Sequence, residues 1–371
     1  MQEPTHNPFR DMKQSVEKER VPGGASSAVH PVSAALLRWY DAHGRELPWR
    51  GTRAPYAIWL SEVILQQTRI EQGRPYWERF MAHYPTVEAL AAATEDQVLR
   101  LWQGLGYYSR GRNLLVAARQ VVAQGGFPRT VAGLKALKGV GDYTAAAIAS
   151  MAFDVPVAVV DGNVYRVLAR HQGIDTPIDS TQGKHLFAAL AQEWLPPSQP
   201  AAFNQAMMDF GATWCTPRAP RCTDCPIADT CVARHEGTIA SLPVKAGKTR
   251  VRTRQFHYVY VRCGTATALR RRPAGDIWQG LWEPLLVEGD RALLQQAVRS
   301  IAGKGNAQLV LLRQGVRHVL THQLIVAHFH LLDCGSFTPQ LPSGYQWVEE
   351  ADLDRHAKPR LVERLLALLP R

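Results

Sequence analysis

Apolar residues recur at helical spacing through the first two thirds of the chain, in long Ala- and Leu-rich stretches that Gly and Pro interrupt. This pattern predicts an all-helical domain at residues 33–236. A segment rich in Gly, Pro and basic residues follows at 237–254, and we interpret it as a linker. Beyond it the hydrophobic period changes to two, which predicts a smaller α+β domain at residues 255–371. Its expected strands are 256–262, 265–270 and 319–332, and its expected helices are 292–301 and 361–369.

Residues 1–32 mix Pro, Gly, Ser and both charge signs without any period, which predicts a disordered leader. The 371-residue chain carries 43 Lys and Arg against 32 Asp and Glu, a formal net charge of +11. Such a surplus favours a polyanionic partner such as nucleic acid, although solubility alone would also account for it. No apolar run approaches the roughly 18 residues of a membrane span, so we expect no membrane partner.

Four of the six cysteines lie close together, separated by six, two and five residues. Zinc sites usually pair two Cys knuckles across a longer gap, whereas this run has a single knuckle with one cysteine on each side. Four thiolates are the usual ligands of a [4Fe–4S] cluster, which we therefore favour over zinc. Disulfides are less favoured because the chain shows no secretory feature. The predicted ligands are Cys215, Cys222, Cys225 and Cys231.

A glycine-containing turn separates the helices predicted at 131–137 and 144–153. Glycines at this spacing allow positive φ angles and let backbone N–H groups approach another surface, so the turn is suited to binding a DNA phosphate. A plain helix–turn–helix corner is the alternative, because Gly-x-Gly alone is a weak signal. The residues predicted to contact DNA here are Lys138, Gly139, Val140 and Gly141.

Two carboxylates suggest acid–base chemistry. Asp161 precedes the helix predicted at 164–171, where it would cap the N-terminus and have its pKa lowered by hydrogen bonds and the helix dipole. Glu62 lies in a very apolar helix together with Gln66, and its burial would raise its pKa. One protonated acid and one anion are what cleavage of a glycosidic bond requires. The alternatives are a purely structural cap and a solvent-facing Glu62.

Taken together, these pieces resemble the MutY-type adenine DNA glycosylases of the endonuclease III superfamily, from about Ser33 to the C-terminus. Each piece alone is weak, and their number and order carry the resemblance. The pieces are Ser-Glu62-Val-Ile-Leu-Gln-Gln-Thr, Gly104-Leu-Gly-Tyr-Tyr-Ser-Arg, the glycine turn, Asp161-Gly-Asn-Val, Phe203-Asn-Gln-Ala-Met-Met-Asp-Phe-Gly and the four cysteines.

The resemblance implies a two-lobe helix–hairpin–helix glycosylase domain, with its hairpin at about 131–153 and an iron–sulfur loop at 215–231. A Nudix-like domain that reads 8-oxoguanine would follow. The implied enzyme is a monomer, located in the cytoplasm at the nucleoid. It would bind duplex DNA with A:8-oxoguanine or A:G mispairs, flip out the adenine, and hydrolyse its N-glycosidic bond to leave an abasic site.

The resemblance also implies roles for single residues. Glu62 would protonate N7 of adenine and then activate water. Asp161 would stabilise the oxocarbenium ion or form a transient covalent adduct, and Tyr143 would support Asp161. In a Phe-Ser-His turn that contacts 8-oxoguanine in the family, Thr321 takes the place of Ser and keeps a hydroxyl, His322 keeps the His, and Leu320 departs from the Phe. The residues implied to contact the flipped base or the DNA are Arg50, with Trp49 beside it, Gln66, Gln67, Tyr107 and Gln205.

Two positions restrict the chemistry. Bifunctional relatives carry a lysine just after the hairpin glycines, where this chain has Tyr143, and Lys138 is a poor substitute by position. We therefore expect a monofunctional enzyme. A working Nudix hydrolase needs a glutamate-rich helix, whereas residues 291–299 contain no acid, so phosphohydrolysis is not expected.

Three other functions remain open at this point. A related glycosylase could act on other lesions or mismatches, an iron–sulfur protein could bind DNA without catalysis, and a nucleotide-pool hydrolase could use the C-terminal domain. The related glycosylase is disfavoured because the chain lacks the lysine after the hairpin glycines. The non-catalytic protein would not need both Glu62 and Asp161. The nucleotide hydrolase is disfavoured because its helix lacks the glutamates that hold magnesium. We also predict that Arg218 and Arg221, in the cysteine loop, contact DNA phosphates.

Overall fold

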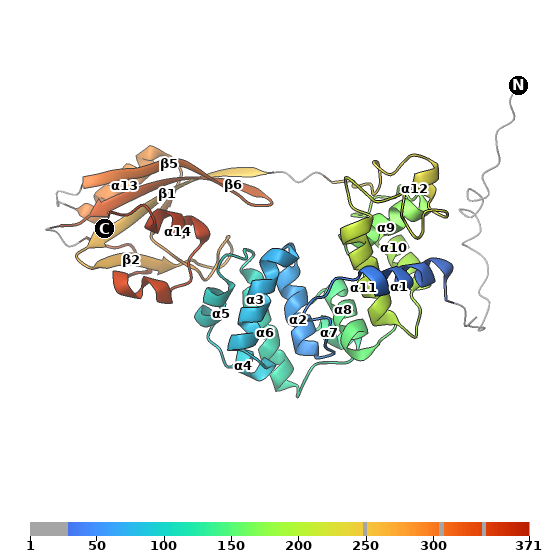
Figure 1. The fold of residues 1–371 in the computed structure, drawn as a ribbon. Coiled ribbons are helices and arrows are strands. Elements are labelled where there is room, and N and C mark those ends of the chain that lie inside the picture. The colour runs from blue at the N-terminus through green and yellow to red at the C-terminus, as the bar shows by residue number, and fades with distance from the viewer. Residues whose placement is uncertain (1–28, 248–250, 304–307, 336–338, 371) are drawn as a thin grey trace, which may run out of the picture.

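The structure is a computed structural model that describes residues 29–247, 251–303, 308–335 and 339–370 of the chain. Figure 1 shows a helical N-terminal body, coloured blue to yellow, and a sheet-containing C-terminal body in orange and red. The predicted fold class is therefore confirmed. Most of the predicted leader lies outside the described residues, and the first helix already begins at Pro31.

The helical domain has two hydrophobic cores, one in each of two lobes. The first core is built around the almost entirely buried α2, with Trp59, Phe80 and Trp102 among its largest side chains. Most of its residues come from the run between Trp49 and Val159, and Leu281 and Ala357 of the C-terminal domain join them. Its helices are α2 (Pro55–Leu65), α3 (Ile70–His83), α4 (Val87–Ala91), α5 (Glu95–Trp102), α6 (Ser109–Ala123), α7 (Val131–Lys135) and α8 (Asp142–Phe153).

The second core combines the first helix of the chain with the helices that follow α8, so both ends of the helical domain meet in one lobe. Phe187, Trp194 and Phe210 are its largest fully buried side chains. A five-residue π-helical turn, η2, follows α11 directly. The elements are α1 (Pro31–His43), α9 (Gly162–Gln172), α10 (Thr181–Trp194), α11 (Pro200–Asp209), η2 (Phe210–Trp214) and α12 (Val232–His235).

Local sequence explains several helix starts. Thr94 and Gln97 form a reciprocal capping box at α5, while Thr130 and Ser180 accept backbone N–H bonds at α7 and α10. These side chains satisfy donors that a helix leaves unpaired at its N-terminus. Among the described residues, no helix is both long enough and apolar enough to cross a membrane.

The C-terminal domain is one mixed sheet in the order β3-β2-β1-β6-β5, with β4 paired to β1 and β7 to β2. Within the described part of this domain, β1 and β6 are the one parallel pair, and the other paired strands are antiparallel. Alternate residues of β1 face opposite sides, where one helix covers each face. The elements are β1 (Arg252–Cys263), β2 (Ala266–Arg271), β3 (Trp282–Glu283), β4 (Leu285–Glu288), α13 (Arg291–Ala302), β5 (Gln308–Val319), β6 (Gln323–Asp333), β7 (Tyr345–Glu349), η3 (Glu350–Arg355) and α14 (Arg360–Leu366).

One predicted element is wrong in its extent. The single strand expected at 319–332 is the end of β5, a short turn and β6, and most of β5 was not predicted. Two register shifts interrupt the pairing of β5, between Leu311 and Arg313 and between Arg313 and Val316. Such bulges break the alternation on which the strand prediction relied. Also, β1 starts at Arg252, inside the predicted linker.

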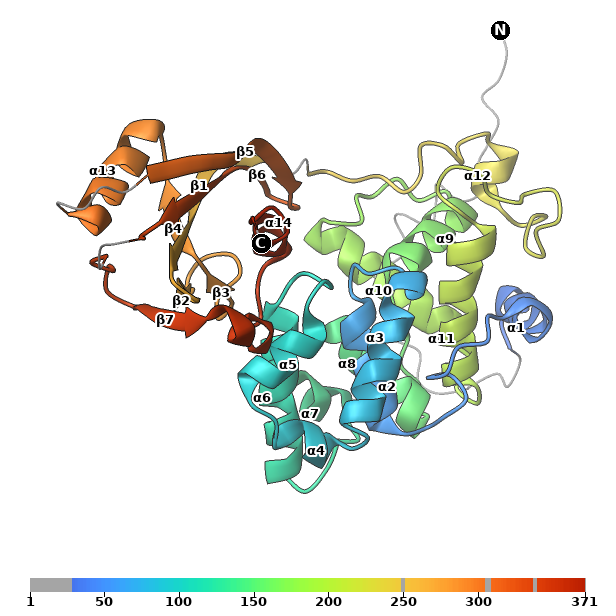
Figure 2. The same cartoon turned by 60° about the vertical axis from the view of Figure 1, so that its left-hand side comes forward.

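The two domains share a contact surface formed by α5 and α6 on one side and the sheet domain on the other. Figure 2 shows α14 lying between the sheet and these helices. The Arg271 guanidinium donates to Glu95 at 2.9 Å, and Gln103 donates to the Glu363 carboxylate. Leu281 of the sheet domain is fully buried within the first helical core. The C-terminal domain is therefore packed against the first lobe.

Candidate active site

Glu62 is a buried acid in the middle of α2. Its neighbours Trp59, Leu60 and Val63 are buried in the core, and Glu62 itself is only 9% exposed. Burial raises the pKa of this carboxyl group to about 7, while the nearby Tyr143 hydroxyl opposes the shift. The predicted burial and the predicted direction of the pKa shift are confirmed. Glu62 can thus carry a proton near neutral pH.

Asp161 caps the N-terminus of α9, as predicted. Its Oδ1 atom accepts the backbone N–H groups of Asn163 and Val164 at 2.8 Å each, and Oδ2 accepts the Asn163 side-chain amide at 2.8 Å. The predicted lowering of its pKa is wrong, because burial raises the pKa of Asp161 more than these hydrogen bonds lower it. Nothing in the cap motif indicates that the Asp161 carboxyl group is buried by other segments of the chain.

Tyr143 projects from the first turn of α8 toward both acids. Its hydroxyl donates to the Met208 sulfur at 3.4 Å. Burial raises the pKa of Tyr143 well above its usual value, and the charges of Glu62 and Asp161 raise it further. The phenol is thus neutral. The structure brings together three predicted site residues that lie up to 99 positions apart in the chain.

Arg50 lies beside this group of acids, in the segment before α2. Its positive charge lowers the pKa of Glu62, which shows that the two side chains are close enough to interact. The guanidinium carbon lies 5.8 Å from the centroid of the Tyr40 ring. The Tyr40 hydroxyl in turn donates to Gln205 at 2.8 Å. Arg50 and Gln205, both expected to contact the flipped base, are therefore connected through Tyr40.

Trp49, the residue before Arg50, is buried in the first core with its ring centroid 5.5 Å from that of Trp77. Its expected contact with a base stays a prediction. Gln66 follows α2 and its side-chain amide donates to the Thr144 hydroxyl at 3.3 Å. Gln67 has a φ of 54°, a conformation that costs energy for a residue with a side chain and is concentrated at functional sites.

The hairpin between α7 and α8 takes the expected form of a tight turn. Gly139 has a φ of 79°, and a Cβ atom at this position would lie only 2.8 Å from Cβ of Asn113. The turn therefore requires glycine for two reasons. The Lys138 backbone N–H donates to the Gln120 side chain at 2.7 Å, and Gly141 directly precedes the first turn of α8. Whether Val140 and its neighbours bind phosphate stays a prediction.

A second pocket of about 480 Å³ lies between the helical domain and the sheet domain. Tyr107 lines it from the loop before α6, with a φ of 46° and 47% exposure. Thr321 and His322 line it from the turn between β5 and β6. The hydroxyl groups of Tyr107 and Thr321 are hydrogen-bonded to each other across the two domains. Three predicted DNA-contacting residues thus meet here, separate from the two acids.

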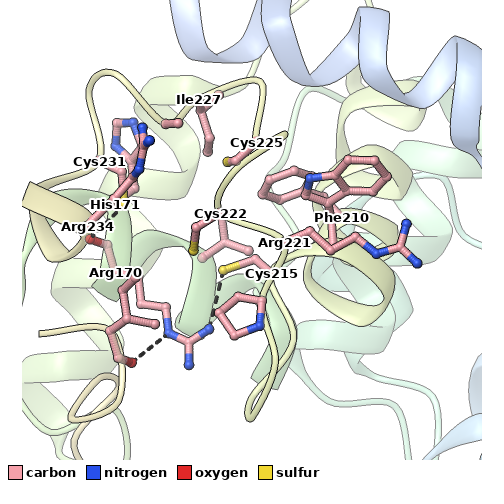
Figure 3. Close-up of a pocket in the computed structure, with 15 residues that line it drawn as sticks. Arg170, His171, Phe210, Cys215, Arg221, Cys222, Cys225, Ile227, Cys231 and Arg234 are labelled. Carbon is pink, nitrogen blue, oxygen red and sulfur yellow. Dashed lines mark hydrogen bonds between the residues drawn. The ribbon is translucent and has the colours of Figure 1, made fainter. Parts of the chain in front are cut away.

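The four cysteines line one cavity between α9, η2 and the loop that follows (Figure 3). All four are free thiols. Burial and, to a smaller extent, the neighbouring thiols raise the pKa of Cys225 to about 11, although a hydrogen bond with the Ile227 backbone opposes the shift. Arg170 donates to the Cys215 sulfur at 3.5 Å, as a dashed line in Figure 3 shows. Four soft sulfur donors beside a cationic donor fit a cluster of several metal ions.

The spacing of these thiols bears on the choice between a cluster and a single ion. Among the residues that the structure describes, no three His, Cys, Asp or Glu side chains converge on one metal ion. The choice between a [4Fe–4S] cluster and a zinc ion therefore stays a prediction.

Several residues that hold the site were not predicted. Asp209, fully buried at the end of α11, accepts hydrogen bonds from both Arg45 and Arg50. Arg110 donates to the Val63 and Ile64 carbonyls and so closes the C-terminus of α2. An acid within the apolar stretch that ends α11 was the available signal for Asp209. Arg110 stands at the end of the motif Gly104-Leu-Gly-Tyr-Tyr-Ser-Arg, but the partners of Arg45 and Arg110 are distant in sequence and could not be predicted.

Two family models match the chain. Residues 60–197 match the HhH-GPD superfamily of base excision DNA repair proteins, and residues 257–368 match the NUDIX domain. The solved structure of a thermostable thymine-DNA glycosylase is 28% identical and superposes with a TM-score of 0.52, over 55% of this chain and 95% of that chain. Fold and site thus define a helix–hairpin–helix repair protein with a C-terminal Nudix domain.

Curated relatives identify the branch of this superfamily. The adenine DNA glycosylase of Buchnera aphidicola subsp. Schizaphis graminum is 31% identical over 257 residues, which are 68% of this chain and 74% of that protein. The adenine DNA glycosylase of Rattus norvegicus is 46% identical over 222 residues, or 56% of this chain. This match spans only 43% of the rat protein. The chain belongs to the adenine DNA glycosylase family.

Proposed function

We propose that this protein excises adenine from duplex DNA in which adenine is paired with 8-oxoguanine or guanine, and leaves an abasic site. The observation that carries the proposal is that two differently held acids lie close enough to interact, with Tyr143 acting on both of them. Glu62 has its pKa raised to about 7, and Asp161 accepts two backbone N–H bonds. Cleavage of a glycosidic bond requires a proton donor and a group that stabilises the sugar cation.

The proposed reaction begins when adenine leaves the base stack and enters the pocket, because the glycosidic bond is inaccessible within the duplex. Glu62 protonates N7 of adenine as the bond breaks. Asp161 stabilises the positive charge that develops on the sugar, and the neutral Tyr143 hydroxyl supports it. Glu62, now ionised, then takes a proton from the attacking water.

The opposite base would be read at the pocket between the domains. Tyr107 is exposed and stands where an aromatic ring could enter the space left by the flipped adenine. Thr321 and His322 present a hydroxyl and an imidazole to the same pocket. The helix α13 contains no Asp or Glu, so the Nudix domain is proposed to recognise a base rather than hydrolyse a phosphate.

We also propose that Cys215, Cys222, Cys225 and Cys231 hold a [4Fe–4S] cluster. Such a cluster carries redox-active iron when bound, but the proposed hydrolysis needs no electron transfer. Arg170 connects the loop to the rest of the domain, since it also donates to the carbonyls of Thr216 and Pro217 at 2.7 and 2.9 Å. The chain's own role here is to fix the loop that carries Arg218 and Arg221 toward DNA.

The proposed function is tested with one set of duplexes under single-turnover conditions. Adenine release is expected opposite 8-oxoguanine and, more slowly, opposite guanine. No release is expected of thymine opposite guanine or of thymine glycol. Release of thymine glycol without adenine release would instead assign an endonuclease III-like activity. Tight binding without any base release would assign a non-catalytic DNA-binding protein, and cleavage of 8-oxo-dGTP would assign a nucleotide hydrolase.

A second measurement tests the monofunctional mechanism. Borohydride is expected to trap no covalent complex with abasic DNA, because the position after the hairpin glycines is Tyr143 rather than a lysine. A trapped complex that disappears in Lys138→Gln would overturn this part of the proposal. Size-exclusion chromatography of the protein with a mismatched duplex is expected to show one protein per DNA.

A further inference from the structure

We propose that Asp209 is a positioning residue for adenine excision, which holds the Arg50 guanidinium at the wall of the base pocket and partly neutralises it. Asp209 touches neither of the two acids directly, and it would act through Arg50. The inference rests on the proposed function, because its consequence is measured on adenine excision. The observation behind it is a fully buried carboxylate shared by two arginines, one of which, Arg50, lies close enough to Glu62 to act on its charge.

Both oxygen atoms of the Asp209 carboxylate accept several hydrogen bonds. Its Oδ1 accepts from Arg50 Nη2 at 2.6 Å and from Arg45 Nε at 2.9 Å. Its Oδ2 accepts from Arg50 Nη1 at 2.6 Å and from the Arg45 backbone N–H at 2.9 Å. Arg50 is therefore held by two parallel bonds, a geometry that fixes the plane of the guanidinium as well as its position.

The position of Asp209 in the chain also suggests a specific role. It is the last residue of α11, and the π-helical turn η2 begins at Phe210. Single π-helical turns within helices are frequent at functional sites. The Asp209 backbone carbonyl accepts the Thr213 hydroxyl at 2.8 Å, which fastens this turn. The carboxylate is thus anchored from its backbone as well as from its side chain.

Asp209 and Gln205 lie four residues apart on α11, so one helix face carries both. Gln205 accepts the Tyr40 hydroxyl, and Tyr40 lies under the Arg50 guanidinium. Contacts therefore run from Gln205 through Tyr40 and Arg50 to Asp209. Moving Arg50 would therefore disturb the polar wall that is expected to hold the adenine. Displacements of about 1 Å at such a wall can lower a reaction rate about 100-fold.

The charges around Glu62 give the inference a directional test. Tyr143 of α8, Asp161 at the start of α9 and Arg50 are the titratable and charged groups that act on the Glu62 carboxyl. Among them only Arg50 is a cation, and it lowers the pKa of Glu62. The negative charge of Asp209 offsets part of this effect. Removing it would favour ionised Glu62, and removing the Arg45 charge would favour protonated Glu62.

The experiment measures single-turnover adenine excision between pH 5.5 and 9 for the wild-type protein, Asp209→Asn and Arg45→Gln. For Asp209→Asn we expect the rate constant at its optimum to fall about 10- to 100-fold. The alkaline limb of the pH–rate profile of this variant should move to lower pH by about one unit. For Arg45→Gln we expect a smaller loss of rate and a shift of the limb in the opposite direction.

The matched control is Asp154→Asn, which removes the carboxylate of an exposed ion pair with Arg53. This variant should keep both the wild-type rate and the wild-type pH profile. Binding to a duplex with a tetrahydrofuran abasic analogue should stay within about twofold for every variant, because no base then occupies the pocket. Binding to a duplex with non-cleavable 2′-fluoro-deoxyadenosine should weaken for Asp209→Asn alone.

Each outcome has one meaning. If Asp209→Asn lowers only the thermal midpoint and the active fraction, with an unchanged rate constant and pH profile, Asp209 is structural and the inference is wrong. If Asp209→Asn does not fold, the pH profile of Arg45→Gln is the deciding measurement. An alkaline limb that is unshifted, or shifted to lower pH, in Arg45→Gln overturns the inference. If the wild-type protein releases no adenine, the proposed function fails instead.

Discussion

The two candidate sites of this protein are built in opposite ways. Around the two acids, the polar groups are buried or partly buried and bonded to neighbours before any ligand arrives, as Asp161 and Arg50 illustrate. The pocket between the domains is lined by exposed side chains on loops and turns, such as Tyr107 and Thr321. Bond cleavage depends on groups whose pKa is set in advance, whereas reading a base within a duplex requires an open surface.

The strongest test of this contrast is the removal of the proposed acid. Glu62→Gln keeps the shape of the side chain but cannot donate a proton, so single-turnover excision should fall about 10²- to 10⁴-fold. Binding to a mismatched duplex should persist, because the second pocket is untouched. A Glu62→Gln protein with a near-normal rate constant would refute the role of Glu62.

The pH dependence of the excision rate of the wild-type protein also tests the role of Glu62. In the proposed reaction the protonated form of Glu62 is the active one, and the pKa of Glu62 is raised to about 7. The single-turnover rate should therefore fall about tenfold per pH unit above 7 and level off below it. The measurement is a quenched time course of single-turnover excision at each pH from 6 to 9, with enzyme at a saturating concentration. A rate that rises with pH through this window would show that Glu62 acts only as a base.

Changes in the pocket between the domains should have smaller effects. Thr321→Val removes one hydroxyl and preserves shape, so the preference for 8-oxoguanine over guanine should fall about 2- to 10-fold. The rate on A:G duplexes should not change. Thr265→Val is the control, since the Thr265 hydroxyl bonds Glu349 elsewhere in the same domain. An unchanged preference in Thr321→Val would exclude Thr321 from base recognition.

The smallest effect on catalysis is expected from the cysteine loop. Arg218 and Arg221 are exposed, and Arg221 lies 4.9 Å from the centroid of the Trp214 ring. Replacing both with Gln should reduce the slope of log affinity against log salt concentration by about 2. Excision at saturating enzyme should stay the same. A slope equal to that of the wild-type protein would show that neither arginine contacts phosphate.

The sequence was sufficient to locate the groups whose environment is local. Glu62 could be placed because its own helix is apolar, and Asp161 because a cap residue directly precedes its helix. The net pKa of Asp161 could not be predicted, since burial comes from other segments of the chain. The cap is formed by neighbouring residues, whereas the burial of Asp161 depends on residues far away in the sequence.

Features that depend on distant partners were the ones missed. Asp209 pairs with Arg45 and Arg50, which lie more than 150 positions earlier in the chain, and no periodicity links them. The strand β5 was largely missed because its bulges interrupt the alternation of apolar residues. In both cases tertiary contacts rather than local propensity determine the structure.

The cap formed by Asp161 has a practical consequence. Its carboxylate starts a helix and serves the proposed reaction with the same two oxygens. Asparagine caps helices about as well as aspartate but carries no charge. Asp161→Asn should therefore give a protein that melts within a few degrees of the wild type and stays bound to mismatched duplexes without releasing the base. Such a variant would be a reagent for capturing mispaired sites from genomic DNA.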